Sequence, residues 1–272
     1  MPVTWETDLS RVDVYRAARE AMPFLMVGPV TWDVFEDDSR LPGGPVSFAA
    51  RTAAALGARA HILTGGAEDA SLTALAGHTV HSVKGLATES WSIYNSSSGR
   101  RRLRLIEPLG RMLSPGDFVE GWPEPRNLFL APLMPDDVDV LSFLDRFSSA
   151  AAWVLGQGLQ REVDDEGFVY HPAEPTELLL NCLSLRTSLF LSSDEIASWS
   201  REAIEEVAGR CRQFVITKGA EGLEVKMSGD TYNVGAVSTQ VVDTTAESTG
   251  FIIADLISTA ITTAATDYVP IA

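Results

Sequence analysis

The chain has 272 residues, of which 45% are hydrophobic and 21% are charged, a composition typical of a globular protein. Its 21 Lys and Arg are outnumbered by 37 Asp and Glu, and a surface with a formal net charge of −16 argues against binding to nucleic acid or anionic membranes. Only two cysteines occur, which excludes a disulfide framework, and the absence of a leader or a long apolar run predicts a cytoplasmic protein.

Short apolar runs alternate with helical patterns along the chain, and this predicts an α/β fold with a mostly parallel sheet. The expected strands are residues 24–30, 60–64, 128–131, 153–155, 188–191 and 213–217. The expected helices are residues 46–56, 136–147, 176–183, 201–210 and 248–263. Residues 1–22 are interpreted as an N-terminal extension of one domain that spans residues 23–272.

Two stretches predict antiparallel additions to this sheet. Residues 90–106 form a hairpin pattern, and residues 223–227 and 231–234 form another. Alternation places Arg102 and Arg104 on one face of the first hairpin. There they either meet an anionic substrate group or form a solvated face that protects an edge strand.

The first strand and the first helix carry two candidate acceptor-binding features. Asp33 is expected just beyond the C-terminal end of the first strand, where open α/β sheets bind ligands. Gly43 and Gly44 precede the helix and allow the backbone to approach a ligand closely. The structural alternatives are a solvated turn aspartate and a tight turn.

Two further features lie in the C-terminal third. A buried strand runs into Thr217, Gly219 and Gly222, which form a Thr-x-Gly-x-x-Gly pattern. Asp243, Thr244 and Thr245 then precede the last expected helix, where their side chains could instead serve as caps.

In this order and at this spacing, the four features resemble those of the ribokinase-like (PfkB-type) carbohydrate kinases, and the middle of the chain resembles a sugar- and inositol-kinase-like subgroup. The resemblance spans residues 24–260. It implies a doubly wound, mostly parallel sheet with a small β lid at about residues 33–43 and 90–106. It also implies a sugar or polyol acceptor near the first strand, ATP and Mg²⁺ near the last helix, and a homodimer formed through the lid.

Site residues follow from the resemblance, position by position. Asp33, Gly43 and Gly44 match positions that hold substrate hydroxyls, and Phe48 stands where ribokinases carry a sugar-contacting asparagine. Arg102 is the candidate residue on the lid for binding an anionic group of the substrate. Glu195 matches a glutamate that organises magnesium, although Ser192 replaces the accompanying asparagine. The positions matched to nucleotide binding are Thr217, Gly219, Gly222, Thr244, Thr245, Glu247 and Gly250.

The last motif departs from the family pattern Asp-Thr-Thr-Gly-Ala-Gly-Asp. Thr249 occupies the position of the catalytic aspartate, so Asp243 is the nearest carboxylate, and loss of a general base costs about 10²–10⁴-fold in rate. Ala246 and Ser248 replace the two glycines that shape the anion hole. Glu247, if it points inward, repels a phosphate by about 4 kcal/mol at 4 Å and an effective dielectric of 20, against about 0.3–1 kcal/mol of helix-dipole attraction. We also expect a shorter C-terminal wall than the family usually has.

Two functional hypotheses remain open. The protein is either a carbohydrate kinase that transfers a phosphoryl group from ATP, or a catalytically impaired pseudokinase that binds a small polyhydroxylated ligand or a partner. A nicotinamide oxidoreductase is disfavoured because no Gly-x-Gly-x-x-Gly follows a strand.

Overall fold

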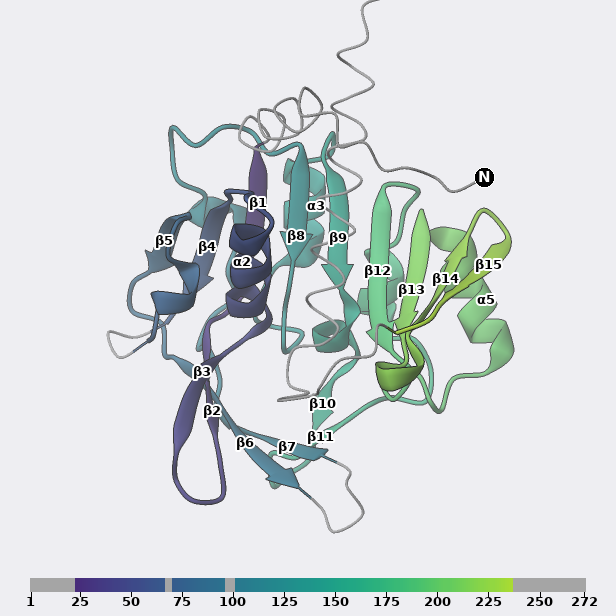
Figure 1. Ribbon diagram of the computed structural model, residues 1–272, viewed down its shortest axis with the longest axis horizontal. Coiled ribbons are helices and arrows are strands. Elements are labelled where there is room, and N and C mark those ends of the chain that lie inside the picture. Colours follow the sequence, from purple (N-terminus) through teal and green to yellow (C-terminus); the bar gives the residue numbers. More distant parts are fainter. Residues whose placement is uncertain (1–22, 67–69, 96–100, 237–272) are drawn as a thin grey trace, which may run out of the picture.

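The computed structural model describes residues 23–66, 70–95 and 101–236. Its main element is a nine-stranded sheet in the order β15-β14-β13-β12-β9-β8-β1-β4-β5 (Figure 1). The strands from β13 to β5 pair in parallel, and β14 and β15 are antiparallel additions at one edge. In chain order, the strands of this sheet are β1 (Phe24–Val27), β4 (His61–Gly65), β5 (Thr79–Val83), β8 (Asn127–Leu130), β9 (Ala151–Leu155), β12 (Thr187–Ser192), β13 (Gln213–Thr217), β14 (Leu223–Met227) and β15 (Asp230–Val234).

Both faces of the sheet are covered, as its continuous apolar strands predict. Successive residues of β1 belong to different apolar clusters, because side chains alternate between the faces of a strand. Leu25 and Val27 pack in one cluster, together with residues of α3 (Val140–Arg146), α4 (Glu177–Asn181) and α5 (Arg201–Arg210). Phe24 and Met26 pack in the other, against α2 (Pro45–Ala55). The expected α/β architecture is therefore confirmed.

Several element boundaries follow from the local chemistry. The predicted strand at residues 213–217 and the predicted helix at residues 201–210 match β13 and α5. Ser200 caps α5, because its hydroxyl accepts a hydrogen bond from the amide of Ala203 at 3.0 Å. The helix α2 begins at Pro45, directly after Gly44. None of the helices in the described ranges is long and apolar enough to cross a membrane.

Three expectations are corrected. The first strand ends at Val27 rather than at residue 30, and residues 28–30 connect it to the lid strand that begins at Thr31. The helix expected at residues 136–147 shortens to α3, since Asp137 folds back to accept two backbone hydrogen bonds and Asp139 becomes the N-cap. The edge strand β5 was missed, because its sequence Thr-Val-His-Ser-Val is polar and half exposed.

The lid is a separate four-stranded sheet in the order β3-β2-β6-β7, at the edge of the main sheet where the parallel strands end (Figure 1). Its strands are β2 (Thr31–Val34), β3 (Arg40–Gly43), β6 (Glu89–Asn95) and β7 (Arg101–Glu107). The strands β2 and β6 pair in parallel, and the two outer pairs are antiparallel. The predicted hairpin around residues 97–99 therefore exists as β6 and β7, although its tip lies outside the described residues.

A two-stranded hairpin, β10 (Glu162–Val163) with β11 (Val169–Tyr170), lies beside the lid. It joins the outer lid strand through a bridge between Arg104 and Phe168.

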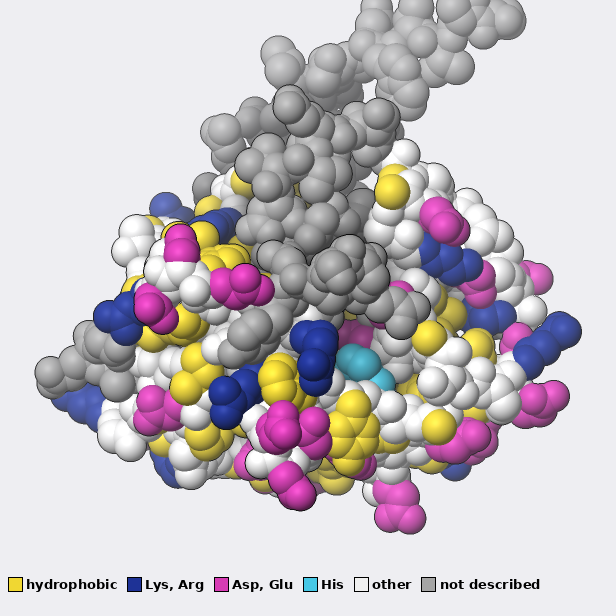
Figure 2. Space-filling model, turned by 90° about the horizontal axis from the view of Figure 1, so that it is seen from below, with side chains coloured by type: hydrophobic (Ala, Val, Ile, Leu, Met, Phe, Trp, Pro, Cys, Tyr) yellow, Lys and Arg dark blue, Asp and Glu magenta, His cyan; other side chains and the backbone are white. Residues whose placement is uncertain are grey.

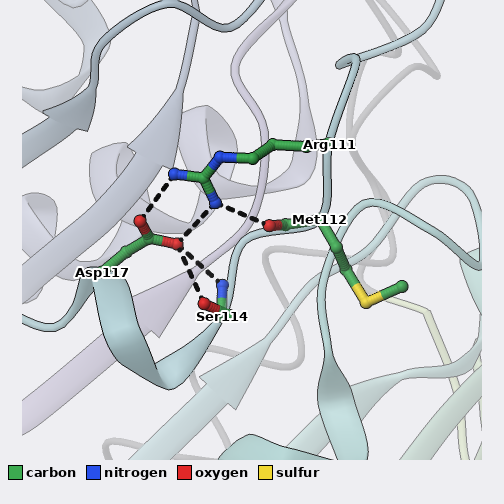
Figure 3. Close-up of polar contacts among 4 residues, drawn as sticks. All are labelled: Arg111, Met112, Ser114 and Asp117. Atoms are coloured by element: carbon green, nitrogen blue, oxygen red, sulfur yellow. Dashed lines mark hydrogen bonds and ion pairs between the residues drawn. The ribbon is translucent and has the colours of Figure 1, made fainter.

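The segment that connects β7 to β8 is held by a bidentate pair, in which the guanidinium of Arg111 donates two hydrogen bonds to the carboxylate of Asp117 (Figure 3).

Candidate active site

Asp33 lies in the lid strand β2 rather than directly at the end of β1. Its carboxylate sits over Gly43 of the neighbouring strand β3, so close that a Cβ atom on Gly43 would lie 2.5 Å from Asp33 Oδ2. The hydroxyl of Thr31 donates a hydrogen bond of 3.1 Å to Asp33 Oδ1. The glycine at position 43 therefore leaves the space in which this half-buried carboxylate rests.

Gly44 and Phe48 lie at the start of α2, next to the lid strands. Gly44 has a φ of +89°, and a Cβ atom there would meet the carbonyl oxygen of Pro29 at 2.6 Å, so the position requires glycine. Phe48 is half-buried on the first turn of the helix, with the guanidinium of Arg51 5.9 Å from its ring centre. The structure thus brings Asp33, Gly43 and the beginning of α2 to the same edge of the sheet.

Sequence reasoning missed a buried group of charges where the lid meets the main sheet. Glu89 opens β6 and Asp137 follows β8, and both are almost completely buried. Arg161 ends the turn after β9 and is also buried; it donates to the carbonyl oxygen of Leu133 at 3.3 Å. Burial raises the pKa of Glu89 well above its usual value and raises the pKa of Asp137 to about 6. Only the fold brings these three residues together, because they lie far apart in the sequence.

Glu195 lies in the turn after β12. Its Oε2 accepts a hydrogen bond from the amide of Ser192 at 2.7 Å, and Ser192 Oγ accepts one from the amide of Glu195 at 3.3 Å. Burial lowers the pKa of the nearby His171, and the negative charge of Glu195 opposes this shift. No cluster of three His, Cys, Asp or Glu ligands occurs within the described ranges. One carboxylate fits Mg²⁺ when phosphate oxygens and water supply the other ligands.

The turn after β13 carries the predicted donor-binding residues. Thr217 is buried at the end of the strand, and its carbonyl oxygen accepts a hydrogen bond from Ser193 at 2.8 Å, which places this turn beside that of Glu195. Gly219 opens a short 3₁₀ turn with a φ of +54°. Gly222 has a φ of +95°, and a Cβ atom there would overlap the carbonyl oxygen of Val234. The chain after β15 therefore crosses directly over this turn.

Arg102 lies on the lid strand β7, with its guanidinium 4.0 Å from the ring centre of Phe168. Arg104 approaches the same ring at 5.9 Å and donates to the carbonyl oxygen of Glu166 at 2.7 Å. The two arginines share a face of β7, as alternation predicts, and both engage the β10–β11 hairpin. On the face of the molecule seen from below, basic side chains are interspersed with acidic and apolar ones (Figure 2).

The remaining predicted positions lie outside the described residues. They are the residues of the last motif, which departs from the family pattern: Asp243, Thr244, Thr245, Ala246, Glu247, Ser248, Thr249 and Gly250. The expected last helix at residues 248–263 and the extension at residues 1–22 lie outside the described ranges as well.

Neither a protein-family model nor a curated protein matches the sequence. Solved structures do match the fold. A pyrophosphate-dependent kinase of the ribokinase family, solved with a pyrophosphate analogue and myo-inositol, has a TM-score of 0.71 and 20% identity over 88% of each chain. Adenosine kinase from Sinorhizobium meliloti has a TM-score of 0.65 and 14% identity over 88% of each chain. Arabidopsis thaliana ribokinase, solved with ribose and ATP, has a TM-score of 0.60 and 16% identity over 88% of this chain and 86% of that one.

The chain therefore has the ribokinase fold of the carbohydrate kinases, as its motifs predict. In this chain the fold consists of the nine-stranded, mostly parallel sheet and the small four-stranded lid.

Proposed function

We propose that this protein is a carbohydrate kinase that binds a sugar or polyol between its lid and its sheet and transfers a phosphoryl group to one of the acceptor's hydroxyls. The main support is the carboxylate of Asp33, which rests over Gly43 at the base of the lid. A carboxylate accepts hydrogen bonds from hydroxyl groups, which polyols supply in number. Gly44 and Phe48, at the start of α2, complete the acceptor side of this proposal.

Each remaining residue has a proposed role on the donor side. Glu195 holds Mg²⁺ through its carboxylate, and the cation neutralises phosphate charge when it is bound. Thr217, Gly219 and Gly222 shape the turn beside Glu195, and Thr244, Thr245 and Gly250 contribute to the phosphate site. Phosphoryl transfer depends mainly on positioning and charge stabilisation. A chain with Thr249 in place of an aspartate therefore retains a reduced rate rather than none.

The donor is ATP or pyrophosphate. The pyrophosphate-dependent kinases with this fold favour the second choice, since their TM-scores of 0.67–0.71 exceed the 0.60 of the ribokinase solved with ATP. Pyrophosphate also requires no adenine pocket. Arg102, whose guanidinium lies 4.0 Å from the ring centre of Phe168, remains the candidate on the lid for binding an anionic group of the acceptor.

A second candidate function is binding without catalysis. It is favoured by one observation, the replacement of both glycines and the aspartate of the last motif by Ala246, Ser248 and Thr249. Glu247 in the same turn adds a negative charge where the donor's phosphates are expected.

The test is a phosphotransfer assay over myo-inositol, sugars and nucleosides, with Mg²⁺ and either ATP or pyrophosphate. The wild-type chain is compared with a variant that carries Ala246→Gly, Glu247→Ala, Ser248→Gly and Thr249→Asp. Turnover by the wild type, increased by about 10²–10⁴-fold in the variant, supports the kinase. Turnover by the variant alone supports the impaired kinase. Folded proteins that neither turn over nor bind any acceptor contradict both functions.

A further inference from the structure

The lid meets the main sheet through a buried polar junction. Glu89 at the start of β6 has no exposed surface, and Asp137 and Arg161 are 2% and 7% exposed. The three residues come from the lid, from the loop after β8 and from the turn after β9. Charged side chains are rarely buried this completely unless they are paired or hydrogen-bonded with one another.

The hydrogen bonds at this junction require a proton. Leu133 and Met134 donate their amides to Asp137 Oδ2, at 2.8 and 2.6 Å. The indole of Trp91 donates to Glu89 Oε1 at 2.5 Å, whereas Glu89 Oε2 has no donor within the described ranges. Because Trp91 packs on Leu133 and Met134, Glu89 and Asp137 lie at the same contact, where each carboxyl group is the other's hydrogen-bonding partner. Two carboxyl groups can form such a bond only when one of them carries a proton.

Glu89 is the residue that holds the proton. Asp137 accepts two backbone amides, which stabilise its charged form, whereas Glu89 accepts one indole. The pKa of Glu89 is raised first by burial and then by the negative charge of Asp137, and Arg161 opposes the rise.

Other titratable groups surround the junction, among them His171, which follows β11 and interacts with Arg161. Asp136 flanks Asp137 and raises its pKa, and Glu195 acts on Arg161 from the turn after β12. Asp33 lies on the neighbouring strand β2, in register with Trp91. The strand β7 contributes leucines to this face.

We propose that the proton shared by Glu89 and Asp137 is a pH-dependent latch that holds the lid on the sheet. Trp91 of the lid packs on Leu133 and Met134, the residues whose amides Asp137 binds, so the latch and the apolar contact act together. When the lid leaves this loop, water reaches both carboxyl groups and Glu89 releases its proton. This inference does not depend on the proposed kinase activity.

The sign of the pH effect follows from linkage. The pKa of Glu89 is higher in the docked lid than in the undocked lid, so docking is strongest below the undocked pKa. Docking weakens as the pH rises through the docked value, by about ten-fold per pH unit between the two.

Hydrogen exchange at mildly acidic and mildly alkaline pH, corrected for intrinsic rates, tests the latch. In the wild-type chain, amides of β2 and β6 lose protection as the pH rises, while amides of β8 and β9 keep theirs. In Glu89→Gln the amide side chain accepts from Trp91 and donates to Asp137 without a titrating proton, so lid protection no longer depends on pH. Glu107→Gln, which removes an exposed carboxylate from the end of β7, keeps the wild-type behaviour.

Equal lid protection at both pH values in the wild type, or an unchanged pH dependence in Glu89→Gln, overturns the proposal. Infrared spectroscopy decides the matter even if Glu89→Gln fails to fold. The wild type must show the carbonyl band of a buried protonated carboxylic acid at a pH above the usual carboxyl pKa, and this band must disappear near the pH at which lid exchange stops accelerating. Absence of the band contradicts the latch.

Discussion

The two arginine–carboxylate regions, one at Arg161 and one at Arg111, illustrate how burial changes the behaviour of the same chemical groups. At the lid junction, Arg161 is 7% exposed and lies near Glu89 and Asp137. On the segment that returns from the lid, Arg111 pairs with Asp117 at 2.7 Å, and its side chain is 48% exposed (Figure 3). The first region positions the lid against the sheet, and the second fixes a surface turn.

The two regions also respond to pH in opposite directions. Burial raises the pKa of Glu89, so the stability that it contributes is lost as the pH rises through its folded value. The guanidinium of Arg111 lowers the pKa of Asp117, so the stability of that pair is present above the unfolded pKa and is lost as the pH falls. The location of a carboxylate thus decides the sign of its contribution.

The largest effect is expected for Arg161→Ala. Without the guanidinium, the charge of Asp137 is left buried without a nearby cation, and the bond to the carbonyl oxygen of Leu133 is lost. Breaking a buried charge cluster in this way costs about 3–5 kcal/mol in the free energy of unfolding. Urea unfolding measures this loss, and a cost below about 1 kcal/mol would show that the junction is not a significant source of stability.

A smaller effect is expected for Arg111→Ala. Exposed pairs contribute about 0.2–1 kcal/mol, and added salt screens them. The difference in unfolding free energy between this variant and the wild type should therefore shrink at high salt and at acidic pH. A loss as large as that of Arg161→Ala would contradict the distinction between the two regions.

Much of the fold could be predicted because its signals are local. The strand β13 is a continuous apolar run and α5 has a serine cap, so both were located to the residue. The strand β5 was missed, since an edge strand needs few apolar residues. The helix expected at residues 136–147 was too long, because the role of Asp137 depends on amides in the preceding loop rather than on helical periodicity.

The candidate site could be predicted only in part. Asp33, Gly43 and Gly44 were identified by their order along the chain, and the structure brings them together at the lid. Glu89 carried no signal, because its partners Asp137 and Arg161 are 48 and 72 residues away in the sequence. Long-range contacts of this kind exist only after the lid and the sheet have folded together.

The most direct test of the account is the affinity of an acceptor for the wild type and for Asp33→Asn, measured by calorimetry with myo-inositol and sugars. We predict that the wild type binds at least one of them and that Asp33→Asn weakens this binding about 10–100-fold, since a hydrogen bond to a charged group contributes about 1.5–3 kcal/mol. Asp230→Asn, at the exposed edge hairpin, should leave the affinity unchanged. Equal affinities for the wild type and Asp33→Asn, or no binding by the folded wild type, would contradict an acceptor site between lid and sheet.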